Sequence, residues 1–165
     1  MDTLLRNLYF HISALSAFIL DMGYTHYWYK NYDAEETVFE AKYAELLPIV
    51  EKIVRIAGVQ LEGNVSSEYI ELNGIGSDGH ETFVWLPGKS VGDFNMLMPC
   101  GLFSFCKTAR KDYDIVVVAV LCAIQQIYGA ELVKINSDGD MVNDWAAGRE
   151  IYETAVALLE EKVKE

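Results

Sequence analysis

The sequence predicts an α+β fold, an antiparallel or mixed sheet of about four strands packed with helices, in the order α-α-β-β-β-α-β-α. Three observations lead to this class. Long segments at both ends and in the middle repeat apolar residues with a helical period. Short β-rich runs lie between these segments, and helices and strands do not alternate strictly. Such an order favours segregated helices and strands over a parallel, doubly wound sheet.

The chain has 165 residues, enough for one domain with its own core, and no Gly/Ser-rich or Pro-rich linker divides it. We therefore expect a single α+β domain over 1–165. Within it, a helical N-terminal part at 1–58 precedes a sheet-and-helix part at 65–165.

The first predicted element is a helix near the N-terminus. Gly23 follows it, at a position where helices commonly end. One side of this helix is an apolar stripe, which would either pack on its own domain or form a seam between subunits. Self-association through this helix is therefore one expectation. A signal peptide is less favoured, because Asp2 replaces a basic cluster and no A-x-A site follows. The stripe consists of Leu5, Leu8, Ile12, Leu15, Ile19 and Met22.

Aromatic side chains are concentrated in the next stretch, "YTHYWYKNY", at residues 24–32. These rings could form a surface that stacks on bases, sugars or a peptide. Alternatively, they cover the core while their hydroxyl groups reach water. Lys30 is the only basic companion, which favours the second interpretation. The candidate aromatic surface consists of Tyr24, Tyr27, Trp28, Tyr29 and Tyr32.

A second helix is predicted from Asp33, an N-cap residue with Glu36 three positions later as an acidic capping box. Pro48 lies inside the pattern and either kinks one helix or divides it in two; the unbroken register favours a kink. Gly58 ends the helix. Its predicted buried face consists of Phe39, Tyr43, Leu46, Val50, Ile53 and Ala57.

Four strands are predicted after the helical part. "SEYIELNGI" at 67–75 and "HETFVWL" at 80–86 flank a turn at 76–79 and indicate a hairpin. Residues 87–99 contain prolines and glycines typical of a loop. "CGLFSFCK" at 100–107 is the third strand, and "AELVKIN" at 130–136 is the fourth.

Between these last two strands lies a stretch, 115–128, that is apolar nearly all round. Its β-branched start could be a buried strand, but its length favours a central helix capped by Asp112 or Asp114. The unbroken apolar run, 115–124, is about half of a membrane span, so no membrane association is expected.

A C-terminal helix is predicted from Asn143 or Asp144. Its buried side consists of Trp145, Ile151, Tyr152, Ala155, Leu158 and Leu159.

Charge and cysteine content exclude several classes of function. A net charge of −12 makes direct nucleic-acid binding unlikely, because phosphates would be repelled. Cys100, Cys106 and Cys122 form no CxxC pair, which indicates reduced thiols and a cytoplasmic protein. No metal site and no cofactor is predicted, and the acidic segment 136–144 is interpreted as a turn rather than a calcium loop.

The segment "FCKTARKDYD", residues 105–114, concentrates positive charge in this acidic chain. If a helix starts at Asp112, Lys107, Arg110 and Lys111 surround its N-terminus, where free amides and the helix dipole favour an anion. Thr108 would add a hydroxyl donor. The alternative is that the cations only neutralise neighbouring carboxylates. A reactive pair of Cys106 and His80 is less favoured than a buried, unreactive Cys106.

The same segment, followed by a long apolar helix and a strand ending in Ser137-Asp138-Gly139, resembles small uncharacterised proteins of phage and bacterial genomes. The resemblance covers roughly residues 70–145 and excludes the N-terminal helices. Those proteins have proline where this chain has Asp112, which suits the first turn of a helix. The resemblance supports a helix after residue 112 and implies no activity.

These observations favour a non-enzymatic binding or regulatory protein, with a phage origin suggested by the resemblance. Its expected partner is another protein, or a second copy bound through the N-terminal helix. The alternative is a small enzyme or ligand-binding domain that holds a phosphate-bearing metabolite or nucleotide at residues 105–114. In that case Lys107 and Arg110 would contact the phosphate.

Overall fold

The fold was obtained as a computed structural model, which describes residues 23–91, 96–98 and 101–163. The helices in these residues are α2 (Glu36–Ile56), α3 (Asp114–Leu132) and α4 (Ala146–Val163), with a short 3-10 helix, η1 (Gly76–Asp78). The strands are β1 (Thr25–Lys30), β2 (Leu61–Val65), β3 (Ile70–Gly74), β4 (Phe83–Trp85), β5 (Met96–Met98), β6 (Gly101–Lys107) and β7 (Val133–Ser137). The helix predicted at 5–22 lies outside the described residues.

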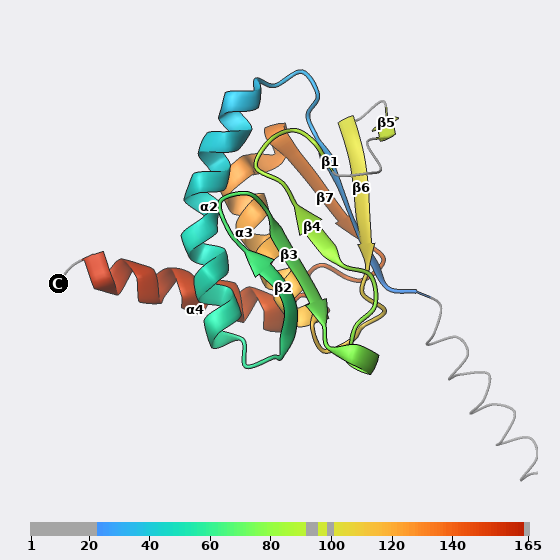
Figure 1. Cartoon of the computed structure of the whole chain (residues 1–165), viewed down its shortest axis with the longest axis vertical. Coiled ribbons are helices and arrows are strands. Elements are labelled where there is room, and N and C mark those ends of the chain that lie inside the picture. The colour runs from blue at the N-terminus through green and yellow to red at the C-terminus, as the bar shows by residue number, and fades with distance from the viewer. Residues whose placement is uncertain (1–22, 92–95, 99–100, 164–165) are drawn as a thin grey trace, which may run out of the picture.

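The strands form two antiparallel sheets (Figure 1). Sheet A has the order β5-β6-β1-β7, so β1 lies between β6 and β7. Tyr27 of β1 is opposite Phe105 of β6 and Asn136 of β7. Sheet B has the order β2-β3-β4 and contains the predicted hairpin as β3 and β4.

Helix α3 is the centre of the core. Every side chain from Val116 to Ile124 is buried, because α2, α4 and β7 all pack around it. Its length and composition would also suit a membrane span, but more than half of that stretch is buried inside the protein. The predicted helix over 115–128 is therefore confirmed, and it forms part of the folded core.

Sheet B packs on the inner face of sheet A through aromatic side chains. The Trp28 ring of β1 has its centre 5.3 Å from that of Phe83 and 6.1 Å from that of Trp85. The indole nitrogen of Trp85 donates to the Tyr128 hydroxyl at 3.3 Å, which joins this cluster to α3. The inner face of sheet A is thus enclosed by sheet B and α3.

The α+β class is confirmed, but the element order and the single sheet were predicted incorrectly. Within the described residues the order is β-α-β-β-β-β-β-α-β-α, and β1, β2 and β5 were not anticipated. Residues 25–30 lack an alternation of apolar and polar types, since His26 and Lys30 point inward with Trp28. The period of two that normally identifies a strand is therefore hidden.

Two predicted helix starts need correction, and a third is narrowed to one of its two alternatives. Helix α2 begins at Glu36 without a side-chain cap, and Glu36 accepts a bond from the Lys89 amide instead of forming a capping box with Asp33. Helix α3 begins at Asp114, one of its two predicted positions, with Tyr113 at the N-cap. Helix α4 begins at Ala146, after the predicted Asn143 or Asp144.

Helix α2 runs unbroken through Pro48, which excludes the prediction of two separate helices. Five of the six predicted core positions of α2 are buried, and Ala57 is half-buried at its C-cap. The predicted strand at 130–136 starts at Val133, because residues 130–132 are helical. Gly129 interrupts α3 before them, with non-helical backbone angles of φ 68° and ψ 163°.

Candidate functional site

The outer face of sheet A carries a continuous group of aromatic rings. Alternation along β1 and β6 places Tyr27, Tyr29, Phe103 and Phe105 on this side, with Tyr27 opposite Phe105 and Tyr29 opposite Phe103. The Phe103 ring centre lies 5.1 Å from that of Tyr29, 6.2 Å from that of Tyr27 and 5.9 Å from that of Phe105. We call these four side chains the aromatic face.

No described helix packs on the aromatic face, and its rings stay accessible. Phe105 is 42% exposed, and the other three rings are half-buried by one another. The Tyr27 hydroxyl donates to Asp138 Oδ1 at 2.9 Å; burial and this contact raise the pKa of Tyr27. Exposed aromatic groups of this kind are typical of interaction surfaces.

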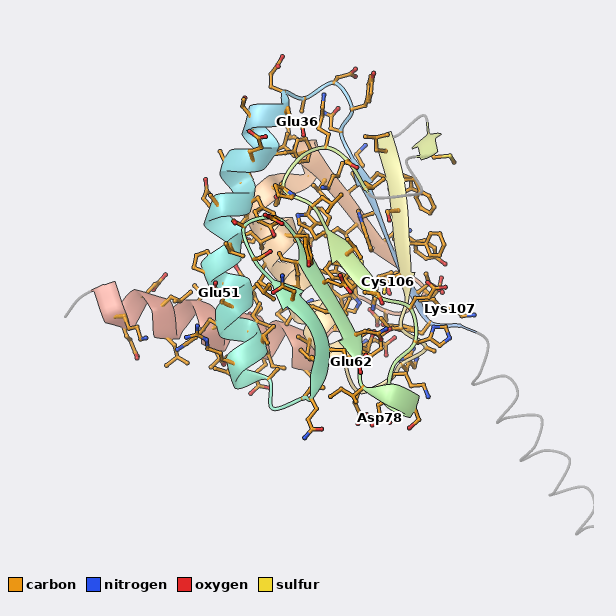
Figure 2. The ribbon with its side chains drawn as sticks, in the orientation of Figure 1. Glu36, Glu51, Glu62, Asp78, Cys106 and Lys107 are labelled. Carbon is orange, nitrogen blue, oxygen red and sulfur yellow. The ribbon has the colours of Figure 1, made fainter. Side chains whose placement is uncertain are left out.

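Lysines lie at both ends of the aromatic face. Lys107 continues the alternation of Phe103 and Phe105 on β6, and Lys134 of β7 is opposite Tyr29. Among the described residues, neither ammonium group has a hydrogen bond or an ion pair within the chain. Figure 2 shows Lys107 near the start of β1. The aromatic face thus has one lysine at each end, while the carboxylate of Asp138 contacts Tyr27.

Beyond the far end of β1, a hollow of about 530 Å³ adjoins the aromatic face. It lies between the loop after β1, the start of β6 and the connection from α3 to β7. Tyr29 belongs to both surfaces. The lining residues are Tyr29, Asn31, Tyr32, Asp33, Met98, Gly101, Ala130, Glu131, Leu132 and Lys134. The hollow thus combines apolar side chains with two carboxylates.

The structure separates the residues of the predicted aromatic surface. Tyr27, Tyr29 and Tyr32 lie at the outer face or the hollow, and Tyr32 is 54% exposed. Tyr24 and Trp28 are buried on the other side of β1. They cannot belong to the same surface, because successive residues of a strand point to opposite faces.

Phe103 and Phe105 were missed as site residues by sequence reasoning. Their spacing of two on a predicted strand indicates a shared face, which is a usable signal. Only the pairing of β1 with β6, however, brings them next to Tyr27 and Tyr29. That register connects residues more than 70 positions apart in the chain.

The cations predicted to bind an anion do not converge in the structure. Arg110 Nη2 donates to Asp144 Oδ2 at 3.2 Å, and its guanidinium carbon lies 3.9 Å from the centre of the Tyr24 ring. Lys111 Nζ donates to the Ser77 carbonyl at 3.1 Å. The two cations face different neighbours, as expected if they neutralise local acceptors.

Lys107 and Thr108 have separate environments as well. The Lys107 amide donates to Glu81 Oε2 at 2.7 Å, while its side chain lies against Gly23 on the outer side of sheet A. Thr108 is fully buried, and its hydroxyl group donates to the carboxylate of Asp114. Thr108 thus binds within the protein and is closed to solvent.

A carboxylate of the chain itself occupies the N-terminus of α3. Asp114 is the first residue of this helix, and its Oδ1 atom lies 2.8 Å from Nε2 of the fully buried His26. The same carboxylate accepts the bond from Thr108. A helix N-terminus favours one negative group, and Asp114 supplies it. An external anion at this position would be repelled by the carboxylate of Asp114.

Lys30 is buried on the inner face of sheet A, with only 1% of its surface exposed. Its Nζ atom donates to the carbonyl groups of Leu86, Gly88 and Ser90 at 2.9, 2.6 and 3.0 Å, and lies 4.2 Å from the centre of the Trp85 ring. Burial lowers the pKa of Lys30 to about 7, against an opposing effect of Glu36. Lys30 fixes the loop after β4 to sheet A.

The cysteine–histidine pairing considered from the sequence is not formed. Cys106 is fully buried; its thiol donates to the Glu81 carbonyl at 3.3 Å, and burial, with a further effect of Glu81, raises its pKa to about 12. His80 is exposed, and its Nδ1 atom is bonded to the Lys107 carbonyl at 2.7 Å. A thiol with so high a pKa stays protonated at neutral pH and is a poor nucleophile.

The described residues contain no group of three or more histidine, cysteine or acidic side chains placed to hold a metal ion. In the segment 136–144, Asp140 accepts from the Val142 amide and from Asn143, which lowers the pKa of Asp140. The carboxylate of Asp144 accepts from the Asp140 amide. These bonds are those of a turn before α4.

Comparison with protein-family models, with curated proteins and with solved structures found no match for this chain.

Proposed function

We propose that this protein is a binding protein that contacts another protein through the aromatic face of sheet A. The observation that carries the proposal is the group of four rings on the outer side of β1 and β6, accessible within the described structure. Burying such rings removes a large apolar area from water, which is the main source of free energy in protein association.

A protein partner suits this surface better than a nucleic acid. Nucleic-acid platforms combine stacked rings with many cations that follow the phosphates. Here two lysines accompany the rings, and the whole chain carries a net charge of −12. Phe103 also stacks on Tyr27 and Phe105 at interplanar angles of 19° and 28°, so the rings are already engaged with one another. A protein partner could bind by packing its aliphatic side chains between and over these rings.

The alternative function, binding of a phosphate-bearing metabolite at residues 105–114, has less support. Arg110 is paired with Asp144, Lys111 with the Ser77 carbonyl, and α3 begins with the carboxylate of Asp114. A phosphate would have to displace these internal partners. No contact in the structure favours a ligand there over them.

Site-specific photo-crosslinking in the cell of origin tests the proposal. Benzoylphenylalanine in place of Phe105 retains an aromatic ring at the exposed end of the face. After irradiation, we expect one dominant crosslinked protein, identified by mass spectrometry. The mass spectrum also identifies the partner's residue that reacted, and this residue must lie within reach of the ring at position 105. The partner is not assumed in advance, because the crosslink itself identifies it.

Val142 provides the matched control, because it is 68% exposed and belongs to the turn between β7 and α4 rather than to the aromatic face. Benzoylphenylalanine at position 142 should give no dominant product. If positions 105 and 142 yield the same scattered products, or neither yields any, the aromatic face is not a contact surface and the proposal is wrong.

A further inference from the structure

Three buried polar side chains without hydrogen-bond partners lie together on the inner side of β1. Within the part of the chain that the structure describes, the unpaired atoms are the Tyr24 hydroxyl, His26 Nδ1 and Trp145 Nε1. These residues are 6%, 0% and 1% exposed. A buried polar atom left unpaired costs free energy, and nearly all such atoms in proteins are bonded to protein or to water.

The rings that carry these atoms contact one another. The His26 ring centre lies 5.0 Å from that of Tyr24 and 5.5 Å from that of Trp145, and each pair meets edge to face, at 86° and 75°. Tyr24 and His26 lie at the start of β1, and Trp145 directly precedes α4. The unpaired atoms therefore belong to one cluster, at the junction of sheet A with α4.

Asp114 determines which atom of the His26 ring is left free. Its Oδ1 atom lies 2.8 Å from His26 Nε2, and a carboxylate oxygen accepts, so Nε2 donates. The ring proton is then on Nε2, and Nδ1 is left as an acceptor. The same carboxylate accepts from Thr108 and belongs to the first residue of α3, which fixes the orientation of the ring.

The three unpaired atoms differ in the bonds that they can form. The indole N–H group of Trp145 only donates, His26 Nδ1 accepts, and the Tyr24 hydroxyl can do either. A molecule that bonds to all three must both accept and donate. An anion without protons cannot donate to Nδ1, and an ammonium ion cannot accept from the indole. Water does both, and a buried water molecule typically makes about three hydrogen bonds.

The turn between β7 and α4 closes the cluster on the side of Tyr24. A Cβ atom added at Gly139 would lie 2.5 Å from the Tyr24 hydroxyl oxygen and 2.5 Å from Asp144 Oδ2, so only a residue without a side chain fits there. The Arg110 guanidinium, paired with Asp144, covers the Tyr24 ring at 3.9 Å from its centre. These contacts separate the cluster from bulk solvent.

Ser137 adds a hydroxyl group beside the cluster. It is opposite His26 in β7, and its Oγ atom accepts from the Gly139 amide at 3.2 Å. Burial raises the pKa of Tyr24, whereas the neighbouring Ser137 side chain lowers it. The Tyr24 hydroxyl thus has a polar neighbour, without a direct bond to it.

We propose that Tyr24, His26 and Trp145 form a binding site for one internal water molecule. The water accepts the hydrogen bond of Trp145 Nε1 and donates to His26 Nδ1, and the Tyr24 hydroxyl is its third partner. It connects α4 to β1 and, through the bond of His26 to Asp114, to α3. The site lies on the inner side of β1 and is independent of binding at the aromatic face.

Nuclear magnetic resonance of the full-length natural protein tests the site in solution. The indole proton of Trp145 should show a cross peak to water with opposite signs in NOESY and ROESY spectra, as a bound water molecule does and direct proton exchange does not. Hydroxyl protons exchange with solvent and can produce such a peak indirectly. The control is therefore the double variant Tyr24→Phe/Ser137→Ala, which removes both neighbouring hydroxyl protons, keeps the ring under Arg110 and should retain the peak.

Two further measurements need no variant. The nitrogen-15 chemical shifts of the His26 ring should place the proton on Nε2 and show that Nδ1 accepts a hydrogen bond. A crystal structure that resolves solvent should place a water oxygen within about 3.2 Å of both His26 Nδ1 and Trp145 Nε1.

The water site is wrong if the Trp145 indole proton of the natural protein shows no cross peak to water. Loss of the peak in a double variant whose circular dichroism matches the natural protein would also overturn it, because the peak would then come from a hydroxyl proton. A crystal structure in which His26 Nδ1 bonds directly to a protein atom would show that the fold itself satisfies the ring.

Discussion

The two faces of strand β1 differ in what their side chains contact. On the inner face, His26, Trp28 and Lys30 are completely or almost completely buried, each against groups from another element. On the outer face, Tyr27 and Tyr29 contact mainly rings of the neighbouring strand β6. One strand therefore serves two purposes, with the fold built on one side and a contact surface left on the other.

Polarity is a poor guide to burial in strand β1. The inner face of β1 holds His26 and Lys30, whereas its outer face holds Tyr27 and Tyr29. Hydrogen bonds offset part of the cost of burying these two side chains. His26 Nε2 is bonded to Asp114, although its Nδ1 atom has no partner among the described residues, and Lys30 donates to three carbonyl groups. We expect substitutions on the inner face to affect stability and those on the outer face to affect binding.

The largest effect is expected for Trp28→Ala. This ring fills the space between the sheets against Phe83 and Trp85, and its loss leaves a cavity that the neighbours cannot close. The free energy of unfolding should fall by about 3–5 kcal/mol, measured by urea denaturation. Trp28→Phe, the control, should cost clearly less. If Trp28→Ala costs no more than Tyr27→Ala, the contrast between the two faces is wrong.

A smaller, pH-dependent effect is expected for Lys30→Met. The pKa of Lys30 is about 7 in the folded protein and 10.5 in an ordinary lysine, so between these values the unfolded chain binds more protons. The free energy of unfolding of the natural protein should therefore rise with pH across this window, by up to about 1.4 kcal/mol per pH unit from this group. The Lys30→Met variant lacks this contribution.

The measurement compares the two proteins by urea denaturation at pH 6, 7, 8 and 9. Burial raises the pKa of Cys106 and Cys122, which lowers stability at high pH in both proteins, and the subtraction removes this effect. The unfolding free energy of the natural protein minus that of the Lys30→Met variant should increase as the pH rises above about 7. A difference independent of pH would mean that the carbonyl groups keep Lys30 protonated throughout.

Sequence reasoning predicted the parts of the fold whose patterns are local. The apolar run at 115–128 was too long for a strand, and α3 confirms it as a helix. Strand β2 has the sequence LEGNV, in which no residue is fully buried, so it carries little apolar signal. Strand β1 was hidden because its inward residues include His26 and Lys30.

The site could be predicted only in part, because it depends on contacts distant in sequence. Tyr27 and Tyr29 were identified from the aromatic stretch, whereas Phe103 and Phe105 required the register between β1 and β6. The predicted cation cluster failed to converge for a local reason. Residues 109 and 110 both have positive φ, at 51° and 55°, and this bend directs neighbouring side chains to different sides of the loop.

Binding through the aromatic face can be measured with the partner identified from position 105 and the double variant Phe103→Ser/Phe105→Ser. Titration calorimetry should show an affinity at least tenfold lower than that of the natural protein, while urea denaturation shows a loss of about 1 kcal/mol in unfolding free energy, because both rings are only partly buried in the domain. Val142→Ser should change neither quantity. Unchanged affinity, or a loss of stability as large as that of Trp28→Ala, would contradict the assignment of the outer face to binding.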